Sequence, residues 1–363
     1  MGVPIYFAPG YRDASRLFDV SCNLNDSIRH LAESAMTAIP SLQVRLHAPG
    51  GPEALRLETV PVPAPGPGEI RLIHTAIGVN FVDVYHRTGL YPLPALPATL
   101  GVEGAGIVES VGPGVSGLSE GQRVAYAGPP AGAYARVRNL PAERAVALPE
   151  SVPDEAAAGA LLRGMTAHML YSRVRPLRAG DSVLVHAAAG GLGLVLVQWA
   201  RALGARVIGT VGSEAKAALA LAHGLERAVR YREADFVAAA REFGGGDGVD
   251  FAIDGIGADT LVRTLAAVRP YGMVASIGQA GGDSGPLDLA ALGPARSIAL
   301  SRPGVFRFMA DLAHYREGAQ ATLTRLEAGL KVEIGARLPL AEAAEAHRRL
   351  EAGETSGSLL LLP

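Results

Sequence analysis

The spacing of hydrophobic and polar positions changes near residue 160. Before it, short apolar runs are separated by Pro- and Gly-rich breaks at residues 61–68, 112–117 and 128–132. From Ser41 onward, Leu42, Val44 and Leu46 alternate with polar residues, which predicts a strand that carries these three side chains on one face. Short strands with such breaks favour a compact all-β unit over residues 36–160.

After residue 160, strand-like segments alternate with helix-length segments rich in Ala and Leu. The expected strands are residues 182–186, 206–211, 228–231, 249–254, 273–278 and 298–302. Helical patterns follow the first two strands and end near Leu203 and His223. This alternation predicts an α/β fold with a parallel, doubly wound sheet over residues 161–303.

The C-terminal part begins at residue 304 and carries helical patterns at 306–329 and 340–352, then a strand at 358–362. We expect this part to return to the all-β unit. The first domain would then combine residues 36–160 with residues 304–363.

Residues 1–35 are mixed in polarity and show no sustained periodicity, and Met36 looks like the natural start. We expect this segment to be disordered or a mis-assigned extension. The alternative is a functional leader, but the acidic residues of the segment argue against a transit peptide.

Composition excludes several classes of function. The chain has 363 residues, is 49% hydrophobic and carries a net charge of -2. It can therefore bury about two domain cores, and it lacks the charge excess that holds nucleic acid or an anionic membrane. Cys22 is the only cysteine, which excludes an intramolecular disulfide and cysteine-rich zinc sites and fits a reducing cytoplasm. The longest apolar runs, such as residues 187–200, are too short and glycine-broken to span a bilayer.

A glycine-rich turn follows the strand expected at 182–186. It reads Ala188-Ala189-Gly190-Gly191-Leu192-Gly193 and leads into a helix that ends at Leu203. Compared with G-x-G-x-x-G, Ala188 takes the first place, and Gly190 and Gly193 take the second and third. The second glycine lets backbone approach a diphosphate, the third lets helix and strand pack closely, and the helix N-terminus attracts phosphate. We predict a dinucleotide site here; the alternative is a merely structural turn.

The end of the second strand of this unit indicates which dinucleotide binds. A carboxylate there would accept the ribose hydroxyls of NAD, whereas this chain has Ser213 and Lys216, which can both donate to a 2′-phosphate. Lys216 is one of only two lysines in the chain. NADPH is therefore the predicted cofactor. The alternative is a solvated lysine on a helix face, and Glu214 fits NADPH only if its side chain points away.

Several segments, in order along the chain, resemble the zeta-crystallin-like NADPH:quinone oxidoreductases, a zinc-free branch of the medium-chain dehydrogenase/reductase superfamily. They are GVNFVDVYHRTGLYP at 78–92, LGVEGAGIVESVGPGV at 100–115, HAAAGGLGLVLVQWARALGARVIGTV at 186–211, GDGVDFAIDGIG at 246–257 and GSLLLLP at 357–363. The resemblance covers essentially everything after Met36. It implies a GroES-like, mostly β substrate domain and a Rossmann domain that binds NADPH. It also implies a homodimer through cofactor-domain strand edges, for which the strand near Ile298 is the candidate.

In zinc-dependent relatives, the segment matching residues 101–106 carries a metal-binding histidine followed by glutamate. Here Val102 stands in the place of that histidine, before Glu103. We therefore expect no catalytic zinc. Glu103 is expected to hydrogen-bond the backbone or to pair with an arginine.

The resemblance also implies roles for single residues. Asn80, Asp83 and Tyr85 would line the cleft between the domains, with Asn80 and Tyr85 as the catalytic pair beside the nicotinamide and the substrate carbonyl. Besides the glycine turn, Ser213 and Lys216, the implied cofactor contacts are Asn80, Thr166, Tyr231, Gly278, Gln279 and Arg302. On the sequence alone, Asn80 is equally a loop-capping residue, Tyr85 a half-buried aromatic, Tyr231 a core tyrosine at a strand end, and Thr166 an N-cap or helix-interior hydroxyl.

Three positions depart from the family pattern. Arg163 replaces a lysine, Gly255 replaces a serine, and Ala352-Gly353-Glu354 stands where some relatives have an arginine that reaches the cofactor.

We expect hydride transfer from NADPH to a quinone or to the β-carbon of an enone, with hydrogen bonds from Asn80 and Tyr85 in place of a metal and a proton from water or Tyr85. An enoyl-thioester or alkenal double-bond reductase is the alternative. A non-catalytic NADPH-binding or RNA-binding protein is more remote, since the chain lacks a basic run. A sugar or alcohol dehydrogenase is disfavoured because the zinc ligands are missing.

Overall fold

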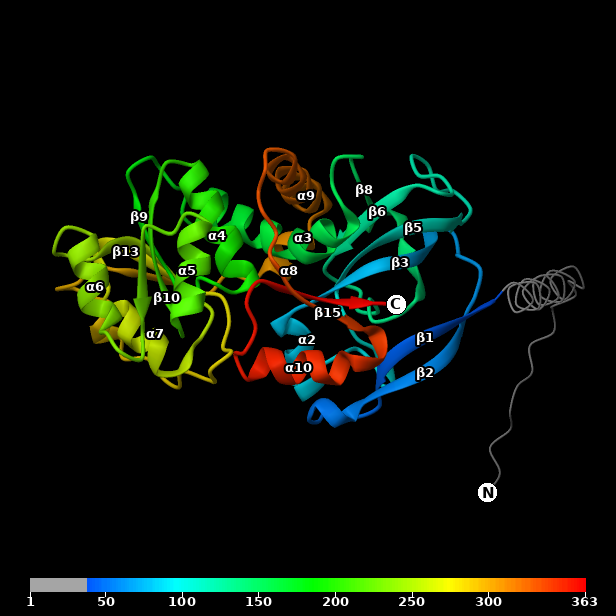
Figure 1. Ribbon diagram of the computed structural model, residues 1–363, viewed down its shortest axis with the longest axis horizontal. Helices are drawn as coiled ribbons and strands as arrows, with labels where there is room; N and C mark the ends of the chain where they lie inside the picture. The colour runs from blue at the N-terminus through cyan, green and yellow to red at the C-terminus, as the bar shows by residue number, and fades with distance from the viewer. Residues whose placement is uncertain (1–37) are drawn as a thin grey trace, which may run out of the picture.

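The computed structural model describes residues 38–363, so the expectation for residues 1–35 lies outside the described part. Two units lie side by side along the long axis of the molecule (Figure 1). One, blue to cyan with the red C-terminus, is mostly β, and the other, green to yellow, alternates strands and helices. No helix within residues 38–363 is long and apolar enough to cross a membrane.

The mostly β unit contains a small sheet and a large one. Its strands are β1 (Ile39–Leu46), β2 (Leu55–Val62), β3 (Glu69–Val79), β4 (Ala98–Thr99), β5 (Glu103–Val111), β6 (Arg123–Ala127), β7 (Val137–Pro141), β8 (Val146–Ala147), β15 (Ile334–Pro339) and β16 (Ser358–Leu362). The small sheet has the order β2-β1-β4, and the large one the order β15-β16-β3-β5-β6-β8, with β7 also paired to β3. β16 runs antiparallel to β3, so the C-terminal strand joins the sheet of the N-terminal part. The predicted domain limits, residues 36–160 with 304–363 and residues 161–303, remain a proposal.

The strand predicted from Ser41 is present as β1. Val44 and Leu46 are buried in the core of this unit, whereas Leu42 is 42% exposed. The apolar face of β1 is therefore covered only over its second half.

The second unit is a six-stranded parallel sheet. Its order is β11 (Arg227–Arg230), β10 (Arg206–Val211), β9 (Ser182–Val185), β12 (Val249–Asp254), β13 (Val268–Ser276) and β14 (Ala299–Ser301). Its helices are α4 (Gly191–Ala202), α5 (Glu214–Ala222), α6 (Phe236–Phe243) and α7 (Ala258–Leu265). The predicted doubly wound sheet is confirmed.

Both faces of this sheet are buried because apolar residues fill consecutive positions of its strands. On β9, Val183 and Val185 belong to the core that contains α4, whereas Leu184 belongs to the core that contains α6 and α7. The two-residue period of a strand sends alternate side chains to opposite layers.

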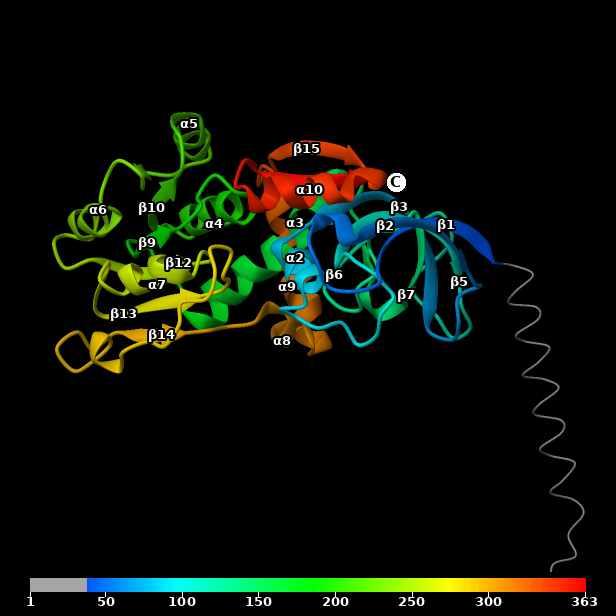
Figure 2. The ribbon, with the colours of Figure 1, turned by 90° about the horizontal axis from the view of Figure 1, so that it is seen from below.

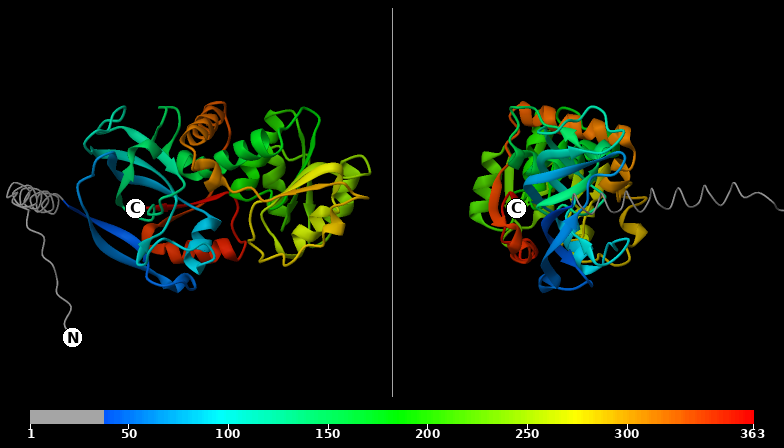
Figure 3. Two further views of the ribbon diagram at one scale, coloured as in Figure 1. Left: turned by 180° about the vertical axis from the view of Figure 1, so that it is seen from behind. Right: turned by 90° about the vertical axis from the view of Figure 1, so that its right-hand side faces the viewer.

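Helices between the two units complete the fold (Figure 2). α3 (Asp154–Met169) packs against β3, β5 and β6 on one side and against α4 on the other. The helix predicted over 306–329 is interrupted: α8 (Val305–Met309) ends before Asp311, whose side chain caps the N-terminus of α9 (Leu312–Glu327). α2 (Phe81–Thr88) and α10 (Ala343–Glu351) belong to the mostly β unit. The red segment between α10 and β16 passes beside the second unit (Figures 1 and 3).

Short helical turns complete the described elements. They are 3-10 turns at Pro52–Ala54, Ala142–Arg144, Leu289–Ala291 and Leu340–Glu342, and a π-helical turn at Leu170–Val174 that continues α3.

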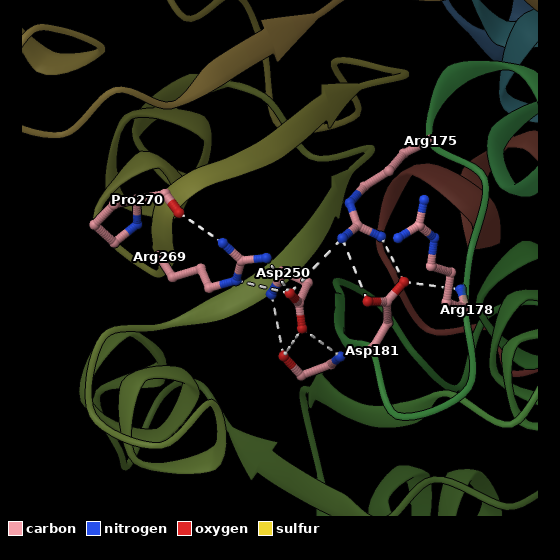
Figure 4. A network of polar contacts seen from close by, with 7 residues as sticks. Arg175, Arg178, Asp181, Asp250, Arg269 and Pro270 are labelled. Carbon is pink, nitrogen blue, oxygen red and sulfur yellow. Dashed lines mark hydrogen bonds and ion pairs between the residues drawn. The ribbon is translucent and has the colours of Figure 1, made fainter.

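A network of charges fastens the amino ends of β9 and β12 (Figure 4). Oδ2 of Asp250 accepts from the backbone N–H (2.8 Å) and hydroxyl (2.7 Å) of Ser182, and Oδ1 accepts from Nε of Arg269 (2.7 Å). Arg175 lies between Asp250 and Asp181 and donates to Asp181 at 2.8 Å. Burial alone would raise the pKa of Asp250, but the hydrogen bonds from Ser182 and Arg269 outweigh it and lower that pKa. This network is at the edge of the sheet opposite to the glycine turn.

Candidate functional site

The glycine turn joins the carboxyl end of β9 to α4 as predicted. Gly190 is the N-cap of α4 in an extended conformation, and Gly191 is its first residue. A Cβ on Gly193 would lie 2.3 Å from the carbonyl oxygen of Ala187, so only glycine permits this approach of helix to turn. Ala188, in place of the first glycine, is fully buried against Gly209, where any Cβ would come within 2.5 Å of the Ala188 methyl. Gly209 therefore accommodates the departure from the glycine pattern.

A buried polar network around His186 supports this turn. Nδ1 of His186 lies 3.0 Å from Oγ1 of Thr210, and its Nε2 lies 2.8 Å from Oγ1 of Thr264. Thr264 donates to Asp254, which also accepts from the backbone N–H groups of Ile256 and Gly257. Burial lowers the pKa of His186 and keeps the ring neutral. The network joins the turn after β9 to the turn after β12.

The residues predicted for the 2′-phosphate meet at the end of β10. Oγ of Ser213 caps α5 by accepting from the backbone N–H of Lys216 (3.3 Å). Nζ of Lys216 donates to the carbonyl oxygen of Gly353 (2.6 Å), which belongs to the segment after α10. Glu214 is the first residue of α5, and its carboxylate forms an ion pair with Arg230 at 3.4 Å. The negative charge of Glu214 is therefore paired with Arg230.

Arg232 is a cation at this end of the site that sequence reasoning did not assign. Its guanidinium lies 5.6 Å from the ring centroid of Tyr231, which is 47% exposed. Burial and the nearby charge of Arg232 both lower the pKa of Lys216. Two cations therefore lie near each other beside the exposed ring. The only indication of this cation in the sequence was that Arg232 directly follows Tyr231, a residue predicted to contact the cofactor.

Asn80 is held from below by a fully buried carboxylate. Its Nδ2 donates to Oε2 of Glu103 (2.8 Å), and Asn80 itself is the N-cap of α2. Oε1 of Glu103 accepts from the backbone N–H of Leu162 (2.7 Å), and Arg163 donates to Oε2 (3.1 Å). The expectation that Glu103 bonds backbone and pairs with an arginine is confirmed.

Asp83 does not line a cleft, and that expectation was wrong. It is fully buried, with Oδ2 accepting from the backbone N–H of Asn80 (2.8 Å) and from the hydroxyl of Tyr134 (3.0 Å). Because Asp83 is the third residue of α2, its carboxyl group turns back to cap the helix. Burial raises the pKa of Asp83 to about 7.

Tyr85 connects the two units. Its hydroxyl oxygen accepts from the backbone N–H of Gln279 (2.9 Å), and the side-chain oxygen of Gln279 accepts from Arg302 (2.7 Å). A Cβ on Gly278 would lie 3.4 Å from the same hydroxyl. The three residues predicted at the ends of β13 and β14 therefore gather around Tyr85.

A cavity of about 550 Å³ opens beside this contact. Its walls are α2 and the loop after β13, with Phe81, Val84, Tyr85, Leu90, Gln279 and Ala280 among its lining residues. Tyr91, which sequence reasoning did not single out, packs edge-on against Tyr85 with ring centroids 5.1 Å apart. Burial raises the pKa of the Tyr85 hydroxyl, so it stays protonated at neutral pH.

Thr166 and Val102, which the sequence analysis also singled out, make ordinary structural contacts. The hydroxyl of Thr166 donates to the carbonyl oxygen of Leu162 (2.8 Å) within α3, as a helix-interior hydroxyl does. Val102 is fully buried in an apolar core. Within residues 38–363, no group of three or more His, Cys, Asp and Glu side chains is placed to hold a metal ion.

Comparisons with known proteins agree with this architecture. Residues 66–150 match the alcohol dehydrogenase GroES-like domain, and residues 191–312 match the zinc-binding dehydrogenase domain. The chain is 42% identical to 2-haloacrylate reductase of a Burkholderia species, over 88% of this chain and 98% of the relative. It is 40% identical to quinone oxidoreductase of Pseudomonas aeruginosa, over 88% of this chain and 99% of the relative.

Solved structures show the same likeness. The Escherichia coli quinone oxidoreductase complexed with NADPH superimposes with a TM-score of 0.85 at 38% identity, covering 89% of this chain and all of that one. A 2-haloacrylate reductase gives a TM-score of 0.77 at 41% identity, covering 89% of this chain and 99% of that one. The chain therefore belongs to the quinone oxidoreductase family of the medium-chain dehydrogenase/reductase superfamily.

Proposed function

We propose that this protein is an NADPH-dependent reductase of quinones and other conjugated carbonyls that works without a metal ion. The observation that carries the proposal is the hydrogen bond of Tyr85 with Gln279. It brings α2, whose N-cap is Asn80, to the carboxyl ends of the parallel strands, where ligands of open α/β sheets bind.

The residues of the cofactor domain fit NADPH. The glycine turn offers backbone N–H groups at the start of α4, and its glycines add no side chains of their own there. Ser213, Lys216 and Arg232 supply donors for a 2′-phosphate. When bound, NADPH supplies the hydride.

Asn80 and Tyr85 would polarise the substrate oxygen. One N–H of the Asn80 amide is taken by Glu103, so the other remains for an acceptor. The Tyr85 oxygen accepts from the Gln279 N–H, which leaves the proton of Tyr85 free for donation to the substrate. The hydride adds to the electrophilic carbon, and the oxygen or α-carbon receives a proton from Tyr85 or water.

The proposed substrate class is a small, electron-poor double bond conjugated to a carbonyl. The relatives are named for quinones and for 2-haloacrylate, and both compounds contain this group. Phe81, Val84 and Leu90 form an apolar side of the cavity beside Tyr85, which suits a flat, uncharged ring, whereas Thr88, Gln279 and Glu351 add polar groups to its lining. A quinone is therefore preferred to an enoyl thioester or alkenal.

NADPH consumption measured with naphthoquinone, an alkenal, 2-chloroacrylate and crotonyl-CoA tests this assignment. We expect the largest kcat/KM with the quinone. A larger kcat/KM with crotonyl-CoA or the alkenal would favour the double-bond reductase instead, and NADPH binding without turnover of any of them would support a non-catalytic role.

We further propose a cytoplasmic homodimer formed through β14. This strand is at the edge of the parallel sheet, and Tyr271 (82% exposed) and Leu289 (76% exposed) belong to segments near this edge. Unpaired strand edges and exposed apolar side chains are typical of interfaces. Sedimentation of wild type and of Leu289→Glu tests the proposal: we expect a dimer that the variant weakens, and a wild-type monomer would contradict it.

A further inference from the structure

Arg163 is an arginine buried at the meeting point of three segments. Its Nη1 donates to Oε2 of Glu103 (3.1 Å) and to the carbonyl oxygen of Gly159 (2.8 Å), and its Nη2 donates to the carbonyl oxygen of Val79 (2.8 Å). The side chain is 9% exposed. The guanidinium therefore fixes the end of β3, the start of β5 and α3 relative to one another.

The same carboxylate oxygen that receives Arg163 also receives Asn80. Oε2 of Glu103 accepts from Nδ2 of Asn80 at 2.8 Å, while Oε1 accepts from the backbone of Leu162. Glu103 is fully buried, and an unpaired buried carboxylate takes up a proton. A protonated Glu103 would present a donor where Asn80 needs an acceptor. The orientation of the Asn80 amide thus depends on the hydrogen bond that the Arg163 guanidinium donates to Glu103.

Arg163 also touches the glycine turn. A Cβ on Gly191 would lie 2.6 Å from Nε of Arg163. Gly191 is the first residue of α4, at the predicted diphosphate site. The Arg163 side chain therefore lies next to both Glu103, which holds Asn80, and the nucleotide turn.

We propose that Arg163 is a positioning residue, which holds the Asn80 amide in its reactive orientation through Glu103 and fixes that support against the nucleotide turn. The proposal rests on the role proposed for Asn80. The resemblance places a lysine here in relatives. A single ammonium group cannot reproduce the planar fork that reaches Glu103, Gly159 and Val79 together.

Arg163→Lys in a double-mutant cycle with Asn80→Ala tests the proposal. We expect Arg163→Lys alone to lower kcat roughly 10-fold, because misorientation of a reacting group costs rate. NADPH affinity, measured by calorimetry, should stay within about twofold. In the Asn80→Ala background, Arg163→Lys should cause no further loss of kcat. Additive losses in the cycle would overturn the proposal, since a structural role would lower kcat in both backgrounds.

Arg71→Lys is the matched control, because Arg71 is also buried and pairs with a carboxylate, Glu109, away from the site. It should leave kcat unchanged. If Arg163→Lys does not fold, Glu103→Gln replaces it in the cycle, with the same non-additive result expected.

Crystal structures separate this proposal from the proposed function. In Arg163→Lys, the contact of Asn80 with residue 103 should be lost or the amide rotated, whatever substrate the enzyme takes. An unchanged Asn80 amide contradicts the positioning role even in an active enzyme. Conversely, wild type that reduces none of the test substrates contradicts the proposed function, while the structural comparison still decides the role of Arg163.

Discussion

The backbone N–H of Gln279 donates to the hydroxyl oxygen of Tyr85 over 2.9 Å, although 194 residues separate the two in the chain. This contact joins α2, whose N-cap is Asn80, to the carboxyl ends of the strands of the parallel sheet, where ligands bind. It also fixes the direction of the Tyr85 proton, because the oxygen has already accepted one hydrogen bond.

Tyr85→Phe should therefore lower kcat about 100-fold, within the range that a general acid contributes. Since burial raises the pKa of Tyr85, wild-type activity should not fall until the pH exceeds the ordinary pKa of tyrosine. A pH profile of kcat for wild type and variant checks both points. Turnover of Tyr85→Phe equal to wild type would assign the proton to water.

Asn80→Ala should lower kcat about 100-fold, the loss typical of one donor to a developing oxyanion. NADPH affinity should change little, because the remaining cofactor contacts are intact. Stopped-flow measurement of hydride transfer and calorimetry of NADPH binding separate the two quantities. Asn139→Ala, on β7, is the control. Unchanged turnover in Asn80→Ala would sink the catalytic assignment.

Lys216→Gln should weaken NADPH binding roughly 10-fold to 100-fold, the equivalent of a charge-assisted hydrogen bond of about 1.5 to 3 kcal/mol. NADH has no 2′-phosphate, so its affinity should stay within about twofold. Lys331→Gln removes the other lysine of the chain and serves as the control. Equal losses for NADPH and NADH would place Lys216 away from the 2′-phosphate.

Stability should fall on acidification because His74 is buried as a neutral ring. Burial lowers its pKa from 6.5 to about 3, and its nitrogens lie 2.6 Å from the carbonyl oxygen of Ala135 and 2.8 Å from the hydroxyl of Tyr126. Between these two pKa values the unfolded chain binds more protons than the folded one, so the free energy of unfolding rises with pH across the window.

The stability that His74 contributes is fully present above pH 6.5 and is lost as the pH falls toward about 3. Urea unfolding at several pH values within this window should give a shallower slope for His74→Gln than for wild type. Parallel slopes would show that His74 does not carry the dependence. His347, whose pKa is likewise lowered to about 3, contributes with the same sign and remains in the variant.

Asp250→Asn should lower the free energy of unfolding by about 2 kcal/mol, because it leaves the buried donors of Ser182 and the partly exposed guanidinium of Arg269 without a carboxylate. The network (Figure 4) lies at the amino ends of β9 and β12, whereas the glycine turn follows the carboxyl end of β9, so kcat per folded molecule should not change. Denaturant unfolding and turnover measured on the same preparation check this pair of expectations. A loss of kcat at unchanged stability would point to a function for this edge.

Short-range patterns in the sequence were sufficient to predict several structural features of this protein. Alternation over a few residues predicted β1, and the strand, turn and helix around Gly190 and Gly193 predicted the nucleotide turn, because periodicity and backbone approach are properties of neighbouring residues. The single cysteine argued against cysteine-rich zinc sites, since a missing ligand is visible without a fold, and Val102 argued against catalytic zinc through the resemblance to zinc-dependent relatives.

Tertiary structure decided how distant residues pair. No sequence pattern near Arg163 indicates that Arg163 and Asn80 bind the same carboxylate oxygen of Glu103. Likewise, no pattern near Lys216 indicates its hydrogen bond to the carbonyl oxygen of Gly353. Asp83 was misjudged as a cleft residue because burial depends on what the rest of the chain places around it. Burial, charge pairing and the resulting pKa values arise from long-range packing, so the sequence could indicate the reacting groups but not the supports that orient them.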